Sequence, residues 1–150
     1  MEDRIQLDDA FDPDEDRPVR SATDNLTYLI IGAAQKVHRT LGPGFGEHIY
    51  HRALARELML RQLPFESEKE LEVFYESYLC GTFKPDFIVG ALIIVELKAV
   101  AELCADHWAQ TKSYLKASGL DNALLMNFGG RSLETRRIFR KKKDQSDHPH

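Results

Sequence analysis

The chain contains no apolar run long enough to cross a membrane as a helix. Its longest apolar stretches stay well short of the roughly 20 residues that a bilayer requires. The amino-terminal residues are acidic and lack the apolar core of a signal peptide. Cysteine is scarce, since Cys80 and Cys104 are the only two in 150 residues, and such a pair is typical of free thiols in a reducing compartment. We therefore expect a cytoplasmic protein with one buried core and no membrane contact.

A strong charge of either sign is also missing from most of the chain. Residues 1–24 contain nine acidic residues against three arginines, whereas residues 25–140 contain 13 acidic residues against 14 lysines and arginines. This division predicts a disordered acidic leader over residues 1–24, one folded domain over 25–140 and a polar tail over 141–150. An acidic arm that covers a basic site is the alternative for the leader. A basic cluster permits a polyanionic partner, and its members are Arg136, Arg137, Arg140, Lys141, Lys142 and Lys143.

Three segments have the apolar spacing of amphipathic helices. They cover residues 25–41, 46–62 and 105–116, and Glu47 falls in the first turn of the second. The residues able to cap the start of the first helix are Thr23, Asp24 and Asn25. Residues that break helices follow each segment, and these are Gly42-Pro43-Gly44, Pro64 and Gly119.

The other regular segments have the composition and alternation of β-strands. They cover residues 66–76, 78–89, 92–100, 122–128 and 132–139. The second is either a strand that ends at residue 83 or a longer one that continues through 86–89, and the last is a strand or a helix. Pro85 interrupts the second segment and should lie at an edge, a bulge or a bend, because it cannot donate a ladder hydrogen bond. The order of helices and strands predicts an α/β or α+β domain with a central mixed sheet flanked by helices.

Two charged residues lie within the apolar segment 91–100. Glu96 and Lys98 are two positions apart, so both side chains of a strand there point to the same face. An unpaired carboxylate in an apolar interior costs several kcal/mol, and such groups are therefore neutralised, paired or bound to a cation. An acid and a base side by side on a buried strand indicate a functional site.

The turn before this strand determines which residue faces Glu96. If residues 90–92 form a three-residue loop, Val89 pairs with Ile93 and Asp86 falls opposite Glu96. Opposed side chains of an antiparallel pair are about 5 Å apart at Cβ, so two charged carboxylates would repel each other. A shared divalent cation would remove that repulsion. A loop of two residues would break the register, and the prediction depends on the longer loop.

These residues resemble a known pattern. Pro85-Asp86, followed by Glu96-Leu97-Lys98 on the next strand, resembles the motif that names the PD-(D/E)XK nuclease superfamily. Glu47 on a preceding helix and Gln110 on the following helix match accessory residues of that superfamily. The segment Gly44-Phe-Gly-Glu47-His-Ile-Tyr50 resembles the signature of the GxxExxY family, which is placed within it. Segments 37–44 and 127–129 are also similar to that family, so the resemblance covers about residues 25–140.

The resemblance implies a restriction-endonuclease-like core with a metal-dependent nuclease site. Asp86 and Glu96 would bind Mg²⁺ or Mn²⁺, and Glu47 would add a ligand directly or through water. Lys98 would orient or activate the attacking water and stabilise developing negative charge. Gln110 would position the water, the metal shell or the substrate backbone.

Each of these residues also has a structural interpretation. Glu96 and Lys98 could form an ion pair within the sheet. Asp86 could serve the turn after Pro85, and Glu47 could be an ordinary acid at a helix start. Gln110 could be a surface amide.

Substrate contacts are expected from His38, Tyr50 and Tyr114. Tyr50 could instead be a core residue with a hydrogen-bonded hydroxyl, and His38 a capping or buried histidine. His48 and His51 lack the compact spacing to Cys80 and Cys104 that a zinc site requires.

The predicted function is metal-dependent hydrolysis of phosphodiester bonds in nucleic acid, with DNA favoured over RNA. One alternative is a nucleic-acid-binding or protein-interaction module that keeps the nuclease fold without turnover. Another is an enzyme that acts on a different phosphate-containing substrate. Because the domain has little net positive charge, its unaided affinity for a duplex should be weak, and a homodimer or a protein partner would strengthen it.

Overall fold

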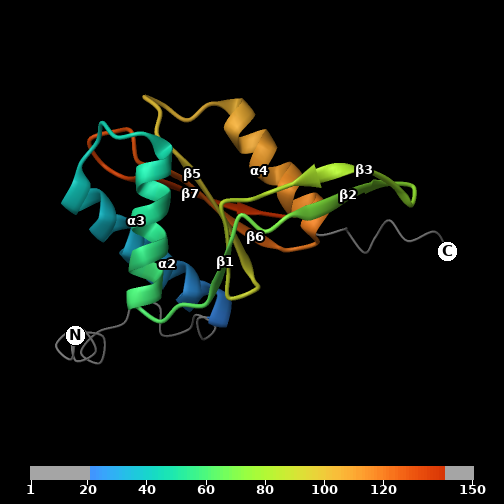
Figure 1. Cartoon of the computed structure of the whole chain (residues 1–150), viewed down its shortest axis with the longest axis horizontal. Coiled ribbons are helices and arrows are strands. Elements are labelled where there is room, and N and C mark those ends of the chain that lie inside the picture. The colour runs from blue at the N-terminus through green and yellow to red at the C-terminus, as the bar shows by residue number, and fades with distance from the viewer. Residues whose placement is uncertain (1–20, 141–150) are drawn as a thin grey trace, which may run out of the picture.

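A computed structural model describes residues 21–140 of the chain. Its helices are α2 (Ala22–Leu41), α3 (Glu47–Leu60) and α4 (Ala105–Ser118). Its strands are β1 (Phe65–Ser67), β2 (Leu71–Tyr75), β3 (Tyr78–Phe83), β4 (Phe87–Val89), β5 (Ile93–Lys98), β6 (Asn122–Asn127) and β7 (Glu134–Phe139). The leader and the tail fall mostly on residues 1–20 and 141–150, which lie outside the described part (Figure 1).

Five strands form a central mixed sheet in the order β1-β4-β5-β6-β7. Only β5 and β6 are parallel, and α4 connects them. The predicted mixed sheet flanked by helices is confirmed: α2 and α3 pack on one face of the sheet and α4 on the other (Figure 1).

The two faces of β5 explain where its charged residues point. Ile93, Val95 and Leu97 belong to the larger core, with α2 and α3, whereas Ile94 belongs to the smaller core, with α4. Since side chains alternate along a strand, Glu96 and Lys98 share the α4 side with Ile94. This alternation is what the spacing of the two charged residues predicted.

Helix α2 begins earlier than predicted. Ser21 is its N-cap, and the hydroxyl of Ser21 accepts a hydrogen bond from the backbone N–H of Asp24 at 3.1 Å. The prediction of a cap at Thr23, Asp24 or Asn25 is therefore wrong, because the helix extends back to the first serine able to accept this bond. The helix ends at Leu41 as predicted, and Gly42 adopts a positive φ of 69°.

The predicted strand over residues 66–76 is two strands in two different sheets. β1 pairs with β4 in the central sheet, whereas β2 pairs with β3 in a separate two-stranded sheet. The backbone turns between them at Glu68, which has a φ of 53°. The strand from residue 78 ends at Phe83, which is the shorter of its two interpretations, and β3 and β4 flank the bend expected at Pro85.

The turn from β4 to β5 has the three residues on which the site prediction depends. Val89 pairs with Ile93, and both Gly90 and Ala91 adopt positive φ. The positive φ at Gly90 favours glycine, and a Cβ there would lie 2.7 Å from a methyl carbon of Leu26, so that side chain would have to move. The conditional register is confirmed.

Within residues 21–140, no helix is long and apolar enough to span a membrane. Cys80 and Cys104 are free, as expected, and both are exposed.

Candidate active site

The side chains of Asp86 and Glu96 each accept a short hydrogen bond from the backbone of the opposite strand segment. The backbone N–H of Asp86 donates to Oε1 of Glu96 at 2.7 Å, and the backbone N–H of Leu97 donates to Oδ2 of Asp86 at 2.7 Å. Asp86 is the residue just before β4, where pairing with β5 ends at Phe87 and Val95. Each carboxyl is therefore anchored by one oxygen, at the point where the two strands separate.

Burial makes these two carboxyls difficult to ionise together. Glu96 is only 5% exposed. Its burial, followed by the charge of Asp86, raises the pKa of Glu96 to about 8. Burial also raises the pKa of Asp86, against the opposing effect of the hydrogen bond from Leu97. Negative charge on both carboxyls is therefore costly, and a bound cation would offset that cost.

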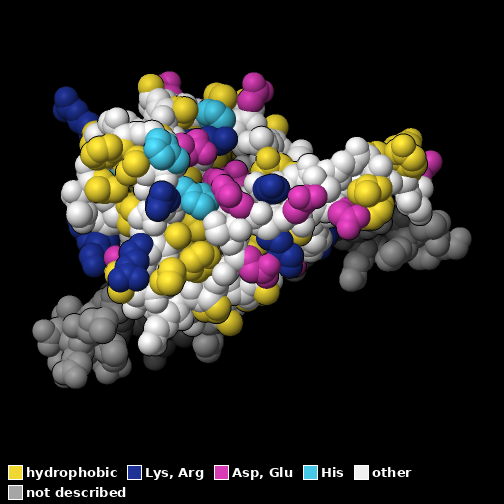
Figure 2. Space-filling view, in the orientation of Figure 1, with side chains coloured by type: hydrophobic (Ala, Val, Ile, Leu, Met, Phe, Trp, Pro, Cys, Tyr) yellow, Lys and Arg dark blue, Asp and Glu magenta, His cyan; other side chains and the backbone are white. Residues whose placement is uncertain are grey.

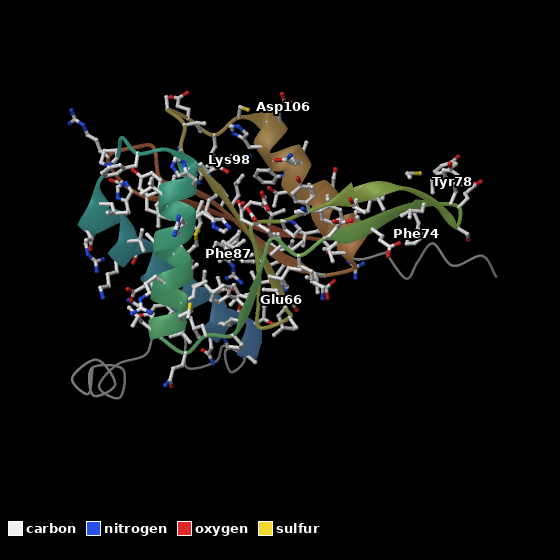
Figure 3. All side chains as sticks on the ribbon, viewed as in Figure 1. Glu66, Phe74, Tyr78, Phe87, Lys98 and Asp106 are labelled. Carbon is white, nitrogen blue, oxygen red and sulfur yellow. The ribbon has the colours of Figure 1, made fainter. Side chains whose placement is uncertain are left out.

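Lys98 and Gln110 meet on the α4 side of the sheet. The ammonium of Lys98 donates to Oε1 of Gln110 at 3.4 Å, and Lys98 lies between α3 and α4 in Figure 3. Tyr114, one turn further along α4, stacks on Phe83 with ring centroids 4.5 Å apart. Burial raises the pKa of Tyr114, and the charges of Glu96 and Asp86 raise it further. The structure therefore brings Gln110 and Tyr114 to the acid pair and Lys98.

Glu47 is the first residue of α3, which approaches the acid pair from the side opposite α4. The pKa of its carboxyl is raised by partial burial and by the charge of Asp86. Glu47 lines a cleft of about 460 Å³ beside Asp86. The complete lining is Glu47, His48, His51, Arg52, Glu68 and Asp86. Histidine, acidic and basic side chains gather on this face of α3 in Figure 2.

His51 is a site residue that the sequence reasoning missed. Its ring stacks on Phe87 with centroids 4.4 Å apart, and Nε2 lies 3.3 Å from the carbonyl oxygen of Asp86. The tautomer with a proton on Nε2 donates to that carbonyl, which positions the backbone of Asp86 from the α3 side. The available signal was the spacing of four residues from Glu47, which puts both side chains on one helix face.

Asn127 fixes the segment that follows Lys98. Its side-chain oxygen accepts from the N–H groups of Val100 and Gly129, both at 3.0 Å, and its Nδ2 donates to the carbonyl of Val100 at 2.9 Å. A Cβ at Gly129 would lie 2.3 Å from the carbonyl oxygen of Val100, so only glycine allows this approach. The end of β5, which carries Lys98, is held in place by these contacts.

His38 and Tyr50 lie in the interior. Nε2 of His38 is 2.9 Å from the carbonyl oxygen of Gly130. The fully buried hydroxyl of Tyr50 donates to the carbonyl of Gly42 at 2.6 Å and accepts from the N–H of Phe45 at 3.2 Å. These contacts correspond to the structural alternatives for both residues, and we propose no substrate contact for either.

Comparison with known protein families shows the superfamily of this chain. The sequence profile described as the PD-(D/E)XK nuclease superfamily matches residues 24–138. The chain belongs to this superfamily. Among solved structures, an alkaline exonuclease (LHK-Exo) from Laribacter hongkongensis matches with 14% identity and a TM-score of 0.41, covering 83% of this chain and 73% of that one. A search of curated proteins found no match.

The donors of this PD-(D/E)XK site fit a hard divalent cation bound largely through water. Within residues 21–140, no three or more His, Cys, Asp or Glu side chains are arranged to hold a metal ion together. Asp86 and Glu96 nevertheless supply two adjacent carboxyls, each anchored through one oxygen. Mg²⁺ is commonly held by one or two carboxylates, several waters and the substrate's phosphate. That mode needs no third protein ligand, and it leaves Glu47 an outer position.

Proposed function

We propose that this protein is a Mg²⁺- or Mn²⁺-dependent nuclease that hydrolyses phosphodiester bonds in DNA, and that it belongs to the GxxExxY family. The observation that carries the proposal is the reciprocal anchoring of Asp86 and Glu96, with Lys98 on the same face of β5. One buried and one partly buried acid with raised pKa values, beside an ammonium, match the needs of phosphodiester cleavage. A purely structural ion pair would not require the second acid.

Each residue has a distinct part in this proposal. Asp86 and Glu96 hold the ion, whose chemistry is to neutralise charge on a phosphoryl oxygen and to acidify a water molecule. Lys98 stabilises the negative charge that develops on the phosphate and orients the attacking water. Gln110 keeps the ammonium of Lys98 in position through the bond of 3.4 Å, and Glu47 orients water at the edge of the cleft.

The substrate strand follows the cleft along α3 in this proposal. Arg52 is an exposed guanidinium on the cleft wall and forms no ion pair with any residue in the described range. It is therefore available to a phosphate next to the one being cut. Glu47 and Glu68 on the same walls oppose an anionic strand, which is consistent with weak unaided binding. Tyr114 contacts the substrate from the α4 side.

A cleavage assay tests the proposal. The full chain should cut DNA when Mg²⁺ or Mn²⁺ is present and not in excess chelator. Glu96→Gln and Lys98→Ala should each reduce cleavage by at least about 100-fold, since the first removes a charged ligand of the ion and the second removes the ammonium that stabilises charge on the reacting phosphate. Lys112→Ala is the matched control, because Lys112 is an exposed lysine on α4. A pure protein that cuts neither DNA nor RNA with either ion would overturn the proposal.

A second candidate is a nuclease-fold module that binds nucleic acid without turnover. No three metal-ligating side chains are grouped within residues 21–140, and binding without turnover requires no such group. Such a protein would bind labelled DNA with the same affinity in Mg²⁺ and in chelator, and Glu96→Gln would leave binding unchanged. The nuclease proposal expects metal to increase the affinity.

A further inference from the structure

The β2–β3 hairpin forms an arm that extends from the body of the protein. We define the arm as residues 71–83 and its tip as residues 74–79. The strands form their own sheet and join through a two-residue turn at Glu76 and Ser77, which both have positive φ. Figure 1 shows the arm running beyond α4, on the side away from α2 and α3. An isolated two-stranded hairpin is marginally stable, so an arm of this kind requires packing along its length.

The root of the arm is packed against the body of the protein, whereas the apolar side chains of its tip are not covered. At the root, Leu71 packs against the smaller core and Phe83 stacks on Tyr114 of α4. The tip has four large apolar side chains that remain exposed, and these are Phe74, Tyr75, Tyr78 and Leu79. Tyr75 and Tyr78 are 68% and 72% exposed. Figure 3 shows Phe74 and Tyr78 at the far end of the arm. An exposed apolar patch of this kind indicates an interaction surface.

A pocket of about 330 Å³ with both apolar and polar walls lies at the opposite end of α4. Leu103, Trp108 and Leu125 line its apolar side, and the ion pair of Glu134 and Arg136 lies at its polar side. Trp108 is 45% exposed although tryptophan is usually well covered. Because the root of the arm packs at Tyr114 and the arm continues away from the body, the tip points away from the pocket of its own chain (Figure 1).

Charge complementarity distinguishes between nucleic acid and a second copy of this chain as the partner of the arm. Three exposed glutamates lie on the arm or directly before it, and these are Glu70, Glu72 and Glu76. The exposed face of α4 carries Lys112 and Lys116. Neither these glutamates nor these lysines form an ion pair with any residue that the structure describes. Nucleic acid would be repelled by the glutamates, whereas the α4 surface of a second copy offers both the lysines and a pocket with the apolar walls of Leu103, Trp108 and Leu125.

We propose that two copies of this chain associate around a two-fold axis, with their α4 helices antiparallel and the tip of each arm in the pocket of the other copy. A two-fold axis makes the same contact twice, so both tips and both pockets are covered. Tyr75 and Tyr78 act as aromatic anchors against Trp108, and the arm's glutamates face Lys112 and Lys116. Aromatic anchors in a desolvated pocket supply most of the binding energy at such interfaces.

Sedimentation analysis of the full chain tests the assembly. The wild type should sediment as a concentration-dependent dimer. The double variant Tyr75→Ser, Tyr78→Ser should weaken dimerisation by at least about 800-fold, since the dimer loses four anchors, two from each tip, of about 1 kcal/mol or more each. The double variant Met59→Ser, Leu60→Ser is the matched control, because these side chains on α3 are 59% and 58% exposed. A wild type that remains monomeric at all concentrations, or a tip variant that dimerises like the control, would overturn the proposal.

A disulfide trap tests the orientation, because native Cys104 lines the pocket. In a Cys80→Ser background, Ser77→Cys puts a thiol at the tip. Oxidised glutathione should then produce a covalent dimer that disappears when Cys104→Ser is added, with the fold of each variant checked by circular dichroism. A covalent dimer that persists without Cys104 would show tip-to-tip contact, and no covalent dimer would show that the tip does not reach the pocket. Either result would overturn the proposed arrangement.

Discussion

Asp86 and Glu96 exchange hydrogen bonds across the ends of β4 and β5. The N–H of Asp86 lies 2.7 Å from Oε1 of Glu96, while Oδ2 of Asp86 accepts from the residue after Glu96. Two acids that should repel each other are thus tied to the same pair of strands. The pKa of Glu96 is raised to about 8 by burial and by Asp86. The free-energy cost of ionising both carboxyls is the basis of the first two predictions.

Glu96→Gln should stabilise the metal-free protein above about pH 5. The pKa of Glu96 is raised from an ordinary 4.5 to about 8 in the folded state, so between these values the unfolded chain releases a proton that the folded chain retains. Ionisation of Glu96 therefore opposes folding, by an amount that increases by about 1.4 kcal/mol per pH unit through this window. Below pH 4.5 the wild type and the variant should converge.

Urea unfolding in chelator at a series of pH values measures this difference. Glu102→Gln is the control, because Glu102 is an exposed glutamate in the loop after β5. A pH dependence that is identical for wild type and Glu96→Gln would mean that Glu96 does not retain its proton in the folded protein.

Mg²⁺ and Mn²⁺ should raise the melting temperature of the wild type. A ligand that binds only the folded state stabilises it by about 2.7 kcal/mol at about 100 times its dissociation constant. Asp86→Asn and Glu96→Gln should lose most of this gain, because each removes a charged oxygen donor. Scanning calorimetry with and without the ions provides the measurement, and KCl of equal ionic strength controls for screening. A rise of equal size in all three proteins would place the ion elsewhere.

Arg52→Ala should weaken DNA binding and reduce its salt dependence. One lost phosphate contact lowers the slope of log affinity against log salt by about 0.9 for duplex DNA. Arg56→Ala is a closely matched control, because Arg56 is an exposed arginine one turn further along α3 and does not line the cleft. Fluorescence anisotropy of a labelled duplex across a salt series measures both effects. Equal slopes for the two variants would exclude Arg52 as a cleft-specific contact.

Tyr50→Phe should destabilise the protein by about 1–3 kcal/mol. The change removes a buried hydroxyl and leaves the carbonyl of Gly42 and the N–H of Phe45 without this partner. Tyr75→Phe controls for the loss of a tyrosine hydroxyl at an exposed position. The free energy of unfolding in urea is the measurement, and a stability equal to wild type would show that the loop over residues 42–46 does not depend on this bond.

Much of the site was predictable because it depends on local spacing. Glu96 and Lys98 share a face since strand side chains alternate, and Asp86 reaches Glu96 because the loop between β4 and β5 has three residues. Glu47 could be assigned to the first turn of α3 from the apolar pattern that follows it. Each of these inferences needs information from only a few neighbouring residues.

Periodicity and turn residues act over short distances, so the amino-acid pattern was enough to predict the mixed sheet, the order of its helices and the strand that carries two charged residues. Only the tertiary structure showed that residues 66–76 divide between two sheets, since an alternating pattern is the same whichever sheet receives the strand. It also brought His51 against Phe87 and the carbonyl of Asp86, and it left the tip of the arm exposed. These contacts join residues that lie far apart along the chain or depend on how elements pack, and no local pattern specifies them.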